Sequence, residues 1–261
     1  VESILNQTYN KFEYILVDNN STDSTPKILK QYAEKDRRVK VLREPKQGVL
    51  YARNTGLRGA RGQWVAILDV DDIALPNRLE YQVNFVKRSP GVVLVGSGHI
   101  LIDEDGGYLK TYNYPNNHET LLKYLENHRS IFAHSSAFYH RQTVLKINGY
   151  RFPHAEDYDL WLRLSLEGKI ACIEEPLIKL RRSISSRSYN INQEHYILHV
   201  LVALVCHLRR RWRLSDPYSI DEEKWNNFLR WTKMRMEGLG VFQKGIAKRE
   251  LSRIKHSKEN K

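Results

Sequence analysis

The segment QWVAILDVDD, residues 63–72, joins an apolar run to three closely spaced carboxylates. Its first part, residues 64–68, has the continuous apolar character of a buried strand. Asp69, Asp71 and Asp72 follow within four residues, and like charges this close repel one another unless a positive group stands opposite them. The segment therefore predicts a strand that ends in a polar site.

Strand and helix patterns alternate on both sides of this segment through the first hundred residues. Strands are expected at residues 13–17, 39–42 and 91–96, and helices after Thr25, after Gly48 and over residues 78–88. Alternation at this spacing predicts βα units and a mostly parallel sheet. Ligands of such sheets bind beyond the carboxyl ends of the strands, where Asp18 and the DVDD aspartates lie.

The later part of the chain has a looser pattern. DEDGG, residues 103–107, reads as a hairpin-like turn, and a helix is expected from Glu156 to Gly168 with a strand after it. Beyond Asn190 an apolar helical stretch leads into a cluster of arginines. We therefore expect a catalytic domain over residues 1–190 and a basic helical extension over residues 191–261.

Composition limits the class of protein. The chain has 261 residues, 41% of them hydrophobic, which is enough for one sizeable core and a smaller appended unit. No apolar run reaches the roughly 18–20 residues that a membrane span needs. Only two cysteines occur, Cys172 and Cys206, which argues against a disulfide scaffold and a zinc site. We expect a protein of a reducing compartment, the cytoplasm.

The net charge of +12 is unevenly distributed. Residues 207–261 contain 15 Lys and Arg against 7 Asp and Glu, a surplus of 8 positive charges. Such tails bind anionic membranes or nucleic acid, or remain a solvated surface, and no groove-reading motif supports nucleic acid. The apolar stretch 196–206 and the Trp212-bearing arginine cluster after it suit the inner face of a membrane. Packing of the same stretch on the catalytic domain is the alternative.

The aspartates of DVDD have two interpretations. Carboxylates one residue apart at a strand end can bind Mg²⁺ or Mn²⁺, which prefer oxygen ligands and are often shared with substrate phosphates. Alternatively, the segment is an exposed acidic turn that caps the next helix, since acidic residues favour helix N-termini. The motif alone leaves both interpretations open.

Four segments in order resemble the family 2 glycosyltransferases. They are SILNQTYNKFEYILVDNNSTDST (3–25), GVLYARNTGLRGARGQWVAILDVDDIALPNRLE (48–80), HAEDYDLWLRLSLEGKI (154–170) and PLIKLRRSISSRS (176–188). The resemblance implies the GT-A fold, an α/β Rossmann-like, mostly parallel sheet flanked by helices. The chain begins after the strand with which the family starts, so we expect that a longer product supplies it.

The resemblance also implies roles on the donor side. Asp18 would contact the nucleotide base, although an Asx-turn also explains an Asp at this position. Asp69 would lie near the ribose or the metal, and Asp71 would be the principal metal ligand with Asp72 beside it. Asn54 of ARNTG would approach the ribose or fix a loop, and the structural role is favoured.

On the acceptor side the resemblance points to EDYD. Asp157 would be the catalytic base and Glu156 would help to place the acceptor, whereas a helix cap is the plain structural interpretation of Asp157. Arg181 or Arg182 would close over the diphosphate, although the histidine usual in this loop of the family is missing here.

The implied function is a metal-dependent, inverting transfer of a sugar. The donor would be a nucleotide-diphosphate sugar, most commonly a UDP-sugar, and the acceptor a glycan or a lipid-linked glycan in cell-surface polysaccharide synthesis. The alternative is a catalytically impaired sugar-nucleotide-binding module, or a basic module that binds a membrane or nucleic acid.

Overall fold

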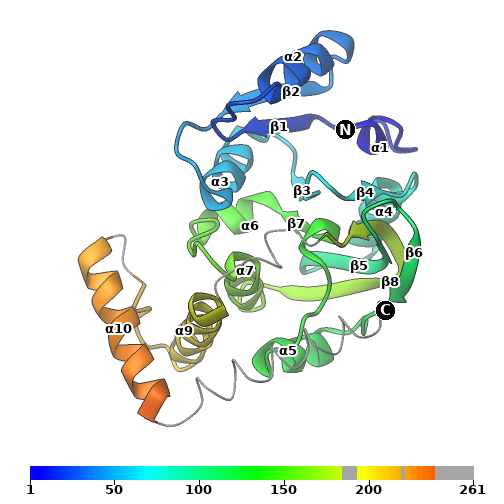
Figure 1. Cartoon of the computed structure of the whole chain (residues 1–261). Coiled ribbons are helices and arrows are strands. Elements are labelled where there is room, and N and C mark those ends of the chain that lie inside the picture. The colour runs from blue at the N-terminus through cyan, green and yellow to red at the C-terminus, as the bar shows by residue number, and fades with distance from the viewer. Residues whose placement is uncertain (184–192, 219–220, 239–261) are drawn as a thin grey trace. The chain divides into compact units, whose positions relative to one another are not determined.

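The computed structural model describes residues 1–183, 193–218 and 221–238 of the chain (Figure 1). It divides into two compact units, Val1–Ser186 and Arg187–Lys261, and each is described by itself. The boundary expected near Asn190 lies outside the described residues.

The first unit mixes helices and strands along its whole length. Its helices are α1 (Glu2–Leu5), α2 (Thr25–Lys35), α3 (Val49–Gly59), α4 (Arg78–Arg88), α5 (His118–Glu126), α6 (Arg141–Lys146) and α7 (Glu156–Leu164), with a 3₁₀ turn, η1, at His134–Ser136. Its strands are β1 (Tyr14–Asp18), β2 (Val39–Arg43), β3 (Trp64–Ala66), β4 (Ile73–Ala74), β5 (Val92–Ile102), β6 (Tyr108–Tyr112), β7 (Phe138–His140) and β8 (Lys169–Arg181).

The strands form two sheets. β1 and β2 pair in parallel, and the larger sheet has the order β3-β7-β5-β8-β4 with β6 added to β5. The expectation of a mostly parallel sheet is wrong for the larger sheet, where only β5 and β8 pair in parallel. β6 follows β5 through the turn expected at residues 103–107, and such a short connection can join only antiparallel strands.

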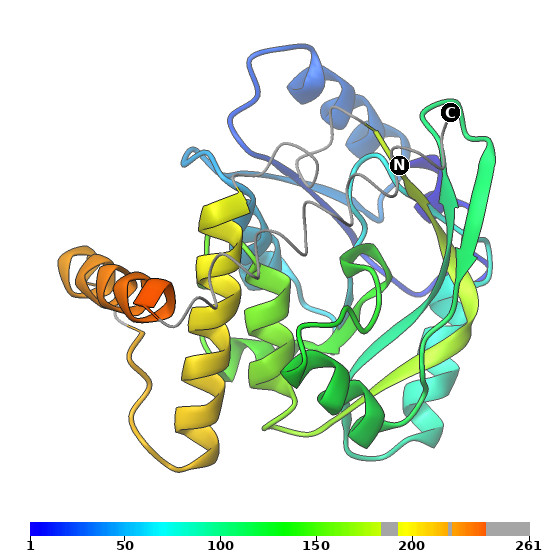
Figure 2. The same cartoon turned by 60° about the horizontal axis from the view of Figure 1, so that its bottom comes forward.

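Helices cover both faces of the larger sheet (Figure 2). On one face of β5, Val95 belongs to an apolar cluster that includes Val83 and Val86 of α4. On the opposite face, the backbone of Gly96 lies directly against the ring of Phe132, which itself contacts Trp161 of α7. Successive residues of β5 thus serve two different layers, as the alternation of a strand requires.

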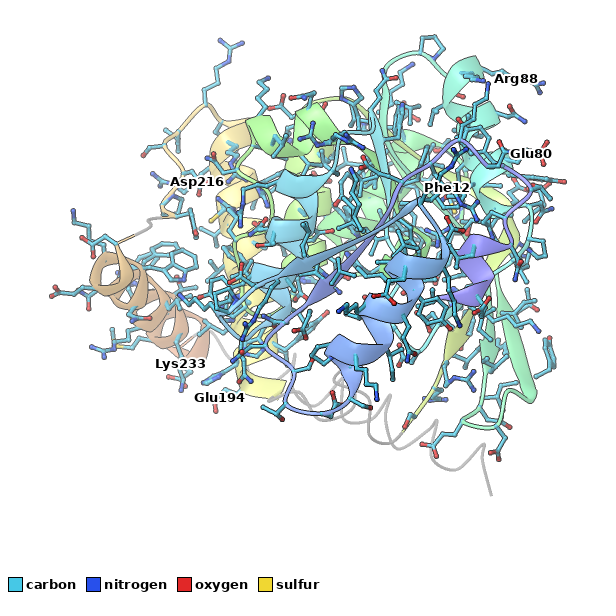
Figure 3. The ribbon with its side chains drawn as sticks, turned by 90° about the horizontal axis from the view of Figure 1, so that it is seen from above. Phe12, Glu80, Arg88, Glu194, Asp216 and Lys233 are labelled. Carbon is cyan, nitrogen blue, oxygen red and sulfur yellow. The ribbon has the colours of Figure 1, made fainter. Side chains whose placement is uncertain are left out.

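The second unit contains two helices, α9 (Gln193–Arg211) and α10 (Glu222–Gly238). Lys233 of α10 forms an ion pair with Glu194 at the start of α9, and Figure 3 shows these two side chains together. Within the described residues, no helix has both the length and the apolar character needed to cross a membrane.

Gly96 provides a test of the packing between β5 and Phe132. A Cβ atom at this position would lie 2.0 Å from Cγ of Phe132, so Gly96→Ala should destabilise the chain by about 3 kcal/mol in urea unfolding. Phe132→Leu removes the obstructing ring, and the double variant should be more stable than the sum of the two single effects predicts. Additive effects would contradict this packing.

Candidate functional site

The DVDD segment forms a loop between β3 and β4. The strand ends at Ala66, two residues earlier than its apolar run suggested, and the loop is then held by hydrogen bonds to the η1 region. The N–H of Ile67 donates to the Ala137 carbonyl at 3.0 Å, and the N–H of Asp69 donates to the Ser135 hydroxyl at 3.1 Å. Val70 is fully exposed at the tip, so the loop projects from the sheet.

The three aspartates of this loop lie in different environments. Asp71 is exposed, and the Asp69 side chain is 44% exposed. Asp72 is buried, with Oδ1 accepting the backbone N–H of Arg181 at 2.8 Å and Oδ2 without a partner among the described residues. Burial raises the pKa of Asp72 to about 6, and the neighbouring charges of Asp71 and Asp69 add to the rise. Asp72 therefore faces the interior of the fold.

Arg53 joins the DVDD loop to the EDYD motif. Its Nη2 donates to Asp69 Oδ1 at 3.2 Å, and its Nη1 donates to Glu156 Oε1 at 2.5 Å. Burial lowers the pKa of Arg53, but the charges of Asp69 and Glu156 outweigh this effect and raise it. Two segments separated by almost ninety residues of sequence are thus fixed by a single guanidinium group.

Asp157 lies in the first turn of α7 beside Glu156. Ala155, the N-cap residue of α7, has a left-handed backbone conformation with φ of 52°. Residues other than glycine adopt this conformation at an energetic cost. Burial, and then the charge of Glu156, raise the pKa of Asp157, against the smaller effects of His134 and Arg53. The result is a partly buried carboxyl group with increased basicity.

His134 is a site residue that the sequence did not reveal. Its Nδ1 lies 3.8 Å from Asp69 Oδ1, its Nε2 is 3.0 Å from the Tyr150 hydroxyl, and its ring stacks on Trp161. Burial alone would raise the pKa of Asp69, but contact with His134 and the charge of Arg53 hold it below its ordinary value. No spacing or motif marks His134, because only the fold brings it to Asp69.

A buried ionic cluster supports the loop that leads into α7. Asp159 accepts from Arg151 at 2.5 and 3.0 Å and from Arg163 at 2.9 Å, and each of these side chains is at most 5% exposed. Arg163 also donates to the carbonyl groups of Ile147 and Gly149. Asp159 therefore fixes the backbone on which the EDYD motif rests.

Asp18 and Asn54 are held by the surrounding backbone. Asp18 ends β1, and its carboxylate accepts the N–H of Ser21, three residues further on, at 3.1 Å. The side-chain amide of Asn54 donates to the Tyr150 carbonyl at 2.8 Å and accepts the Tyr150 N–H at 3.0 Å. Both polar groups of Asn54 thus hold the loop before α7.

The side chain of Arg181 also bonds to the backbone around it. Its guanidinium donates to the carbonyl groups of Asp71, Asp103 and Glu104, with distances of 3.1, 3.1 and 2.6 Å. The adjacent Arg182 continues the pairing of β8 with β5 through its backbone N–H, which donates to the Ile102 carbonyl. Arg181 therefore ties the DVDD loop to the β5–β6 turn.

The donor chemistry of the loop fits a hard divalent cation. Among the residues that the structure describes, no three His, Cys, Asp or Glu side chains form a group able to hold a metal ion. Asp71 and Asp69 nevertheless present accessible carboxylate oxygens, and Mg²⁺ or Mn²⁺ is often bound by one or two carboxylates together with substrate phosphates. The loop suits a cation whose remaining ligands come from a diphosphate.

Comparison with known proteins identifies the family of the chain. A sequence model described as Glycosyl transferase family 2 matches residues 1–147. The O-antigen biosynthesis glycosyltransferase WbnJ of Escherichia coli is 37% identical over 166 residues, which cover 63% of this chain and 64% of WbnJ. The chain thus spans somewhat less than two thirds of this relative.

Solved structures share the fold at low sequence identity. TarS of S. aureus has a TM-score of 0.61 at 18% identity, covering 80% of this chain and 36% of that one. The mannosyltransferase PcManGT from Pyrobaculum calidifontis, in complex with GDP-Man and Mn²⁺, has a TM-score of 0.55 at 20% identity, covering 94% of this chain and 67% of that one. The fold is therefore GT-A, as the sequence motifs implied, and with more than half of its length matched by the family model the chain belongs to the family 2 glycosyltransferases.

Proposed function

We propose that this protein transfers a sugar from a nucleotide-diphosphate donor to a hydroxyl group of a glycan or lipid-linked glycan, with inversion at the sugar carbon. The observation that carries the proposal is the double contact of Arg53 with Asp69 and Glu156. It fixes Asp69, one of the carboxylates suited to a metal and diphosphate, together with Glu156, the neighbour of Asp157, whose partly buried carboxyl has a raised pKa. Departure of the nucleotide diphosphate from the sugar and activation of the acceptor hydroxyl would then take place at adjacent positions.

Asp157 is the proposed base. The acceptor hydroxyl must lose its proton as it attacks the sugar, and a carboxylate with a raised pKa takes that proton more readily than an ordinary one. The charge of Glu156 contributes to the raised pKa of Asp157, while Arg53 holds Glu156 in place through the bond to its Oε1. A single base on the face opposite the leaving group produces inversion without a covalent intermediate.

Asp71 and Asp69 are the proposed metal ligands. A bound Mg²⁺ or Mn²⁺ would supply Lewis-acid stabilisation of the negative charge that develops on the leaving diphosphate. Asp69 is kept ionised by its contacts with His134 and Arg53, which is the state that a cation requires. Asp72 has a different proposed role: its buried Oδ1 anchors the end of β8 through the Arg181 N–H and so sets the position of the loop.

The nucleotide, donor sugar and acceptor are proposed only by class. Asp18 at the end of β1 is the proposed contact to the nucleotide base, and Arg182 remains a candidate for contact with the diphosphate. UDP-sugars are the first donors to test, and GDP-mannose is the second because PcManGT is in complex with GDP-Man. The relationship to WbnJ directs the acceptor search to O-antigen-type glycans.

The role of Asp157 is tested by Asp157→Asn, which preserves shape and removes basicity. We expect donor binding to persist and the transfer rate to fall by roughly 10²–10⁴-fold. Binding is followed by calorimetry and transfer by acceptor-dependent release of nucleotide across the donor panel. Glu34→Gln on exposed helix α2 is the control and should behave as wild type. A parallel loss of binding and rate would assign Asp157 to the donor site instead.

The role of Asp71 is tested under limiting Mn²⁺. Asp71→Asn removes an exposed ligand charge, so the transfer rate should fall by about 10²-fold or more while thermal stability without metal stays unchanged. Asp105→Asn, an exposed carboxylate of the β5–β6 turn, is the matched control. Equal Mn²⁺ titration curves for wild type and Asp71→Asn would exclude Asp71 as a ligand.

The buried position of Asp72 predicts a pH-dependent stability. Its pKa is about 6 in the fold against 3.8 for the reference carboxyl, so the native state binds the extra proton between these values. Stability of the metal-free chain should therefore fall by about 3 kcal/mol in total as pH rises from below the unfolded pKa to above the folded one, and then level off. Asp72→Asn keeps the oxygen acceptor and should remove this component in urea unfolding. Parallel pH profiles of the two proteins would show that Asp72 is not perturbed.

A further inference from the structure

The end of α9 displays large apolar side chains among arginines. Trp212 is 70% exposed, and Leu208 and Leu214 are also exposed, at 40% and 48%. Five of the eleven exposed large apolar side chains in the described part of the chain belong to the second unit. This unit contains only a small share of all the described residues, so its exposed apolar surface is high for its size. We define the α9-end patch as Leu208, Arg209, Arg211, Trp212, Arg213 and Leu214.

The backbone of the patch is a sharply closed helix terminus. The Leu214 N–H donates to the Arg209 carbonyl and the Arg213 N–H to the Arg210 carbonyl, both at 2.9 Å, which is the Schellman arrangement. Arg213 occupies its left-handed position, with φ of 57°, where glycine is the usual residue. The turn thus holds a charged side chain at a strained position between exposed Trp212 and Leu214.

The charges of the patch are only partly compensated by its neighbours. Arg210 forms an ion pair with Asp216, which Figure 3 shows in the segment after α9. Arg209 instead donates to the carbonyl and hydroxyl of Ser215, and neither Arg209 nor Arg213 has a carboxylate partner among the described residues. The patch therefore retains positive charge next to apolar surface.

We propose that the α9-end patch binds the surface of an anionic lipid bilayer. The arginines are attracted to the negative headgroups, and Trp212 with the two leucines enters the boundary between headgroups and acyl chains. Nucleic acid would match the arginines but offers no comparable site for leucine side chains, because single-strand recognition uses aromatic stacking. A second copy of the chain would bring two positive patches together. The bilayer surface satisfies both components of the patch.

The test is cosedimentation of the full chain with vesicles of phosphatidylcholine and increasing fractions of phosphatidylglycerol. Binding should rise with phosphatidylglycerol and fall with added salt. Arg209→Gln/Arg211→Gln/Arg213→Gly should lower the partition coefficient by roughly 10²-fold, with glycine preserving the left-handed turn. Trp212→Ser/Leu214→Ser should lower it by about ten-fold or more without changing the charge.

The control removes the same charge from the other unit. Lys27→Gln/Lys35→Gln/Arg37→Gln changes exposed residues of α2 and its C-terminal end and should retain binding, and circular dichroism confirms folding of each variant. Equal losses of vesicle binding in the control and the arginine variant would show that binding depends only on net charge, and this would overturn the proposal. So would wild-type protein that stays in the supernatant at every lipid composition. Tight binding of a single-stranded oligonucleotide that persists in Trp212→Ser/Leu214→Ser, without vesicle binding, would assign the patch to nucleic acid.

Discussion

The double contact of the Arg53 guanidinium with Asp69 and Glu156 is the constraint on which the rest of the site depends. The Arg53 and Glu156 side chains are only 14% and 9% exposed, so either charge without the other would be costly to bury. The DVDD loop, helix α3 and the start of α7 must therefore take their positions together. A change at any of the three positions alters the electrostatic environment of the other two.

Buried polar side chains next to the site hold in place the loops that carry its carboxylates. Arg78 of α4 is fully buried and donates to the carbonyl groups of Ile67 and Ala137. These two hydrogen bonds join the DVDD loop to the η1 region. Burial lowers the pKa of Arg78 to about 10, with the charge of Asp72 acting in the opposite direction. Asp159 supports the other half of the site through Arg151 and Arg163. The carboxylates are thus carried by loops that are themselves hydrogen-bonded to the interior.

Local sequence patterns predicted the positions of helices and turns better than they predicted how the strands pair. Helix α4 occupies the residues that its apolar spacing indicated, and the turn at residues 103–107 joins two strands as expected. The direction of the strands in the larger sheet was not predictable from alternation, because it depends on which distant strands become neighbours. The same limit applies to the site: the acidic motifs could be located, but their environments depend on contacts between distant segments. His134 and the inward orientation of Asp72 illustrate this.

Asp69 and Asp157 show why those contacts matter for function. Both carboxylates are partly removed from water, which raises the pKa, and both interact with His134 and Arg53, which lower it. In Asp69 the lowering effects prevail, because Arg53 and His134 contact it closely. In Asp157 burial and the nearby charge of Glu156 prevail. The same two side chains thus leave Asp69 ionised, as the proposed metal ligand must be, and Asp157 more basic, as the proposed base requires.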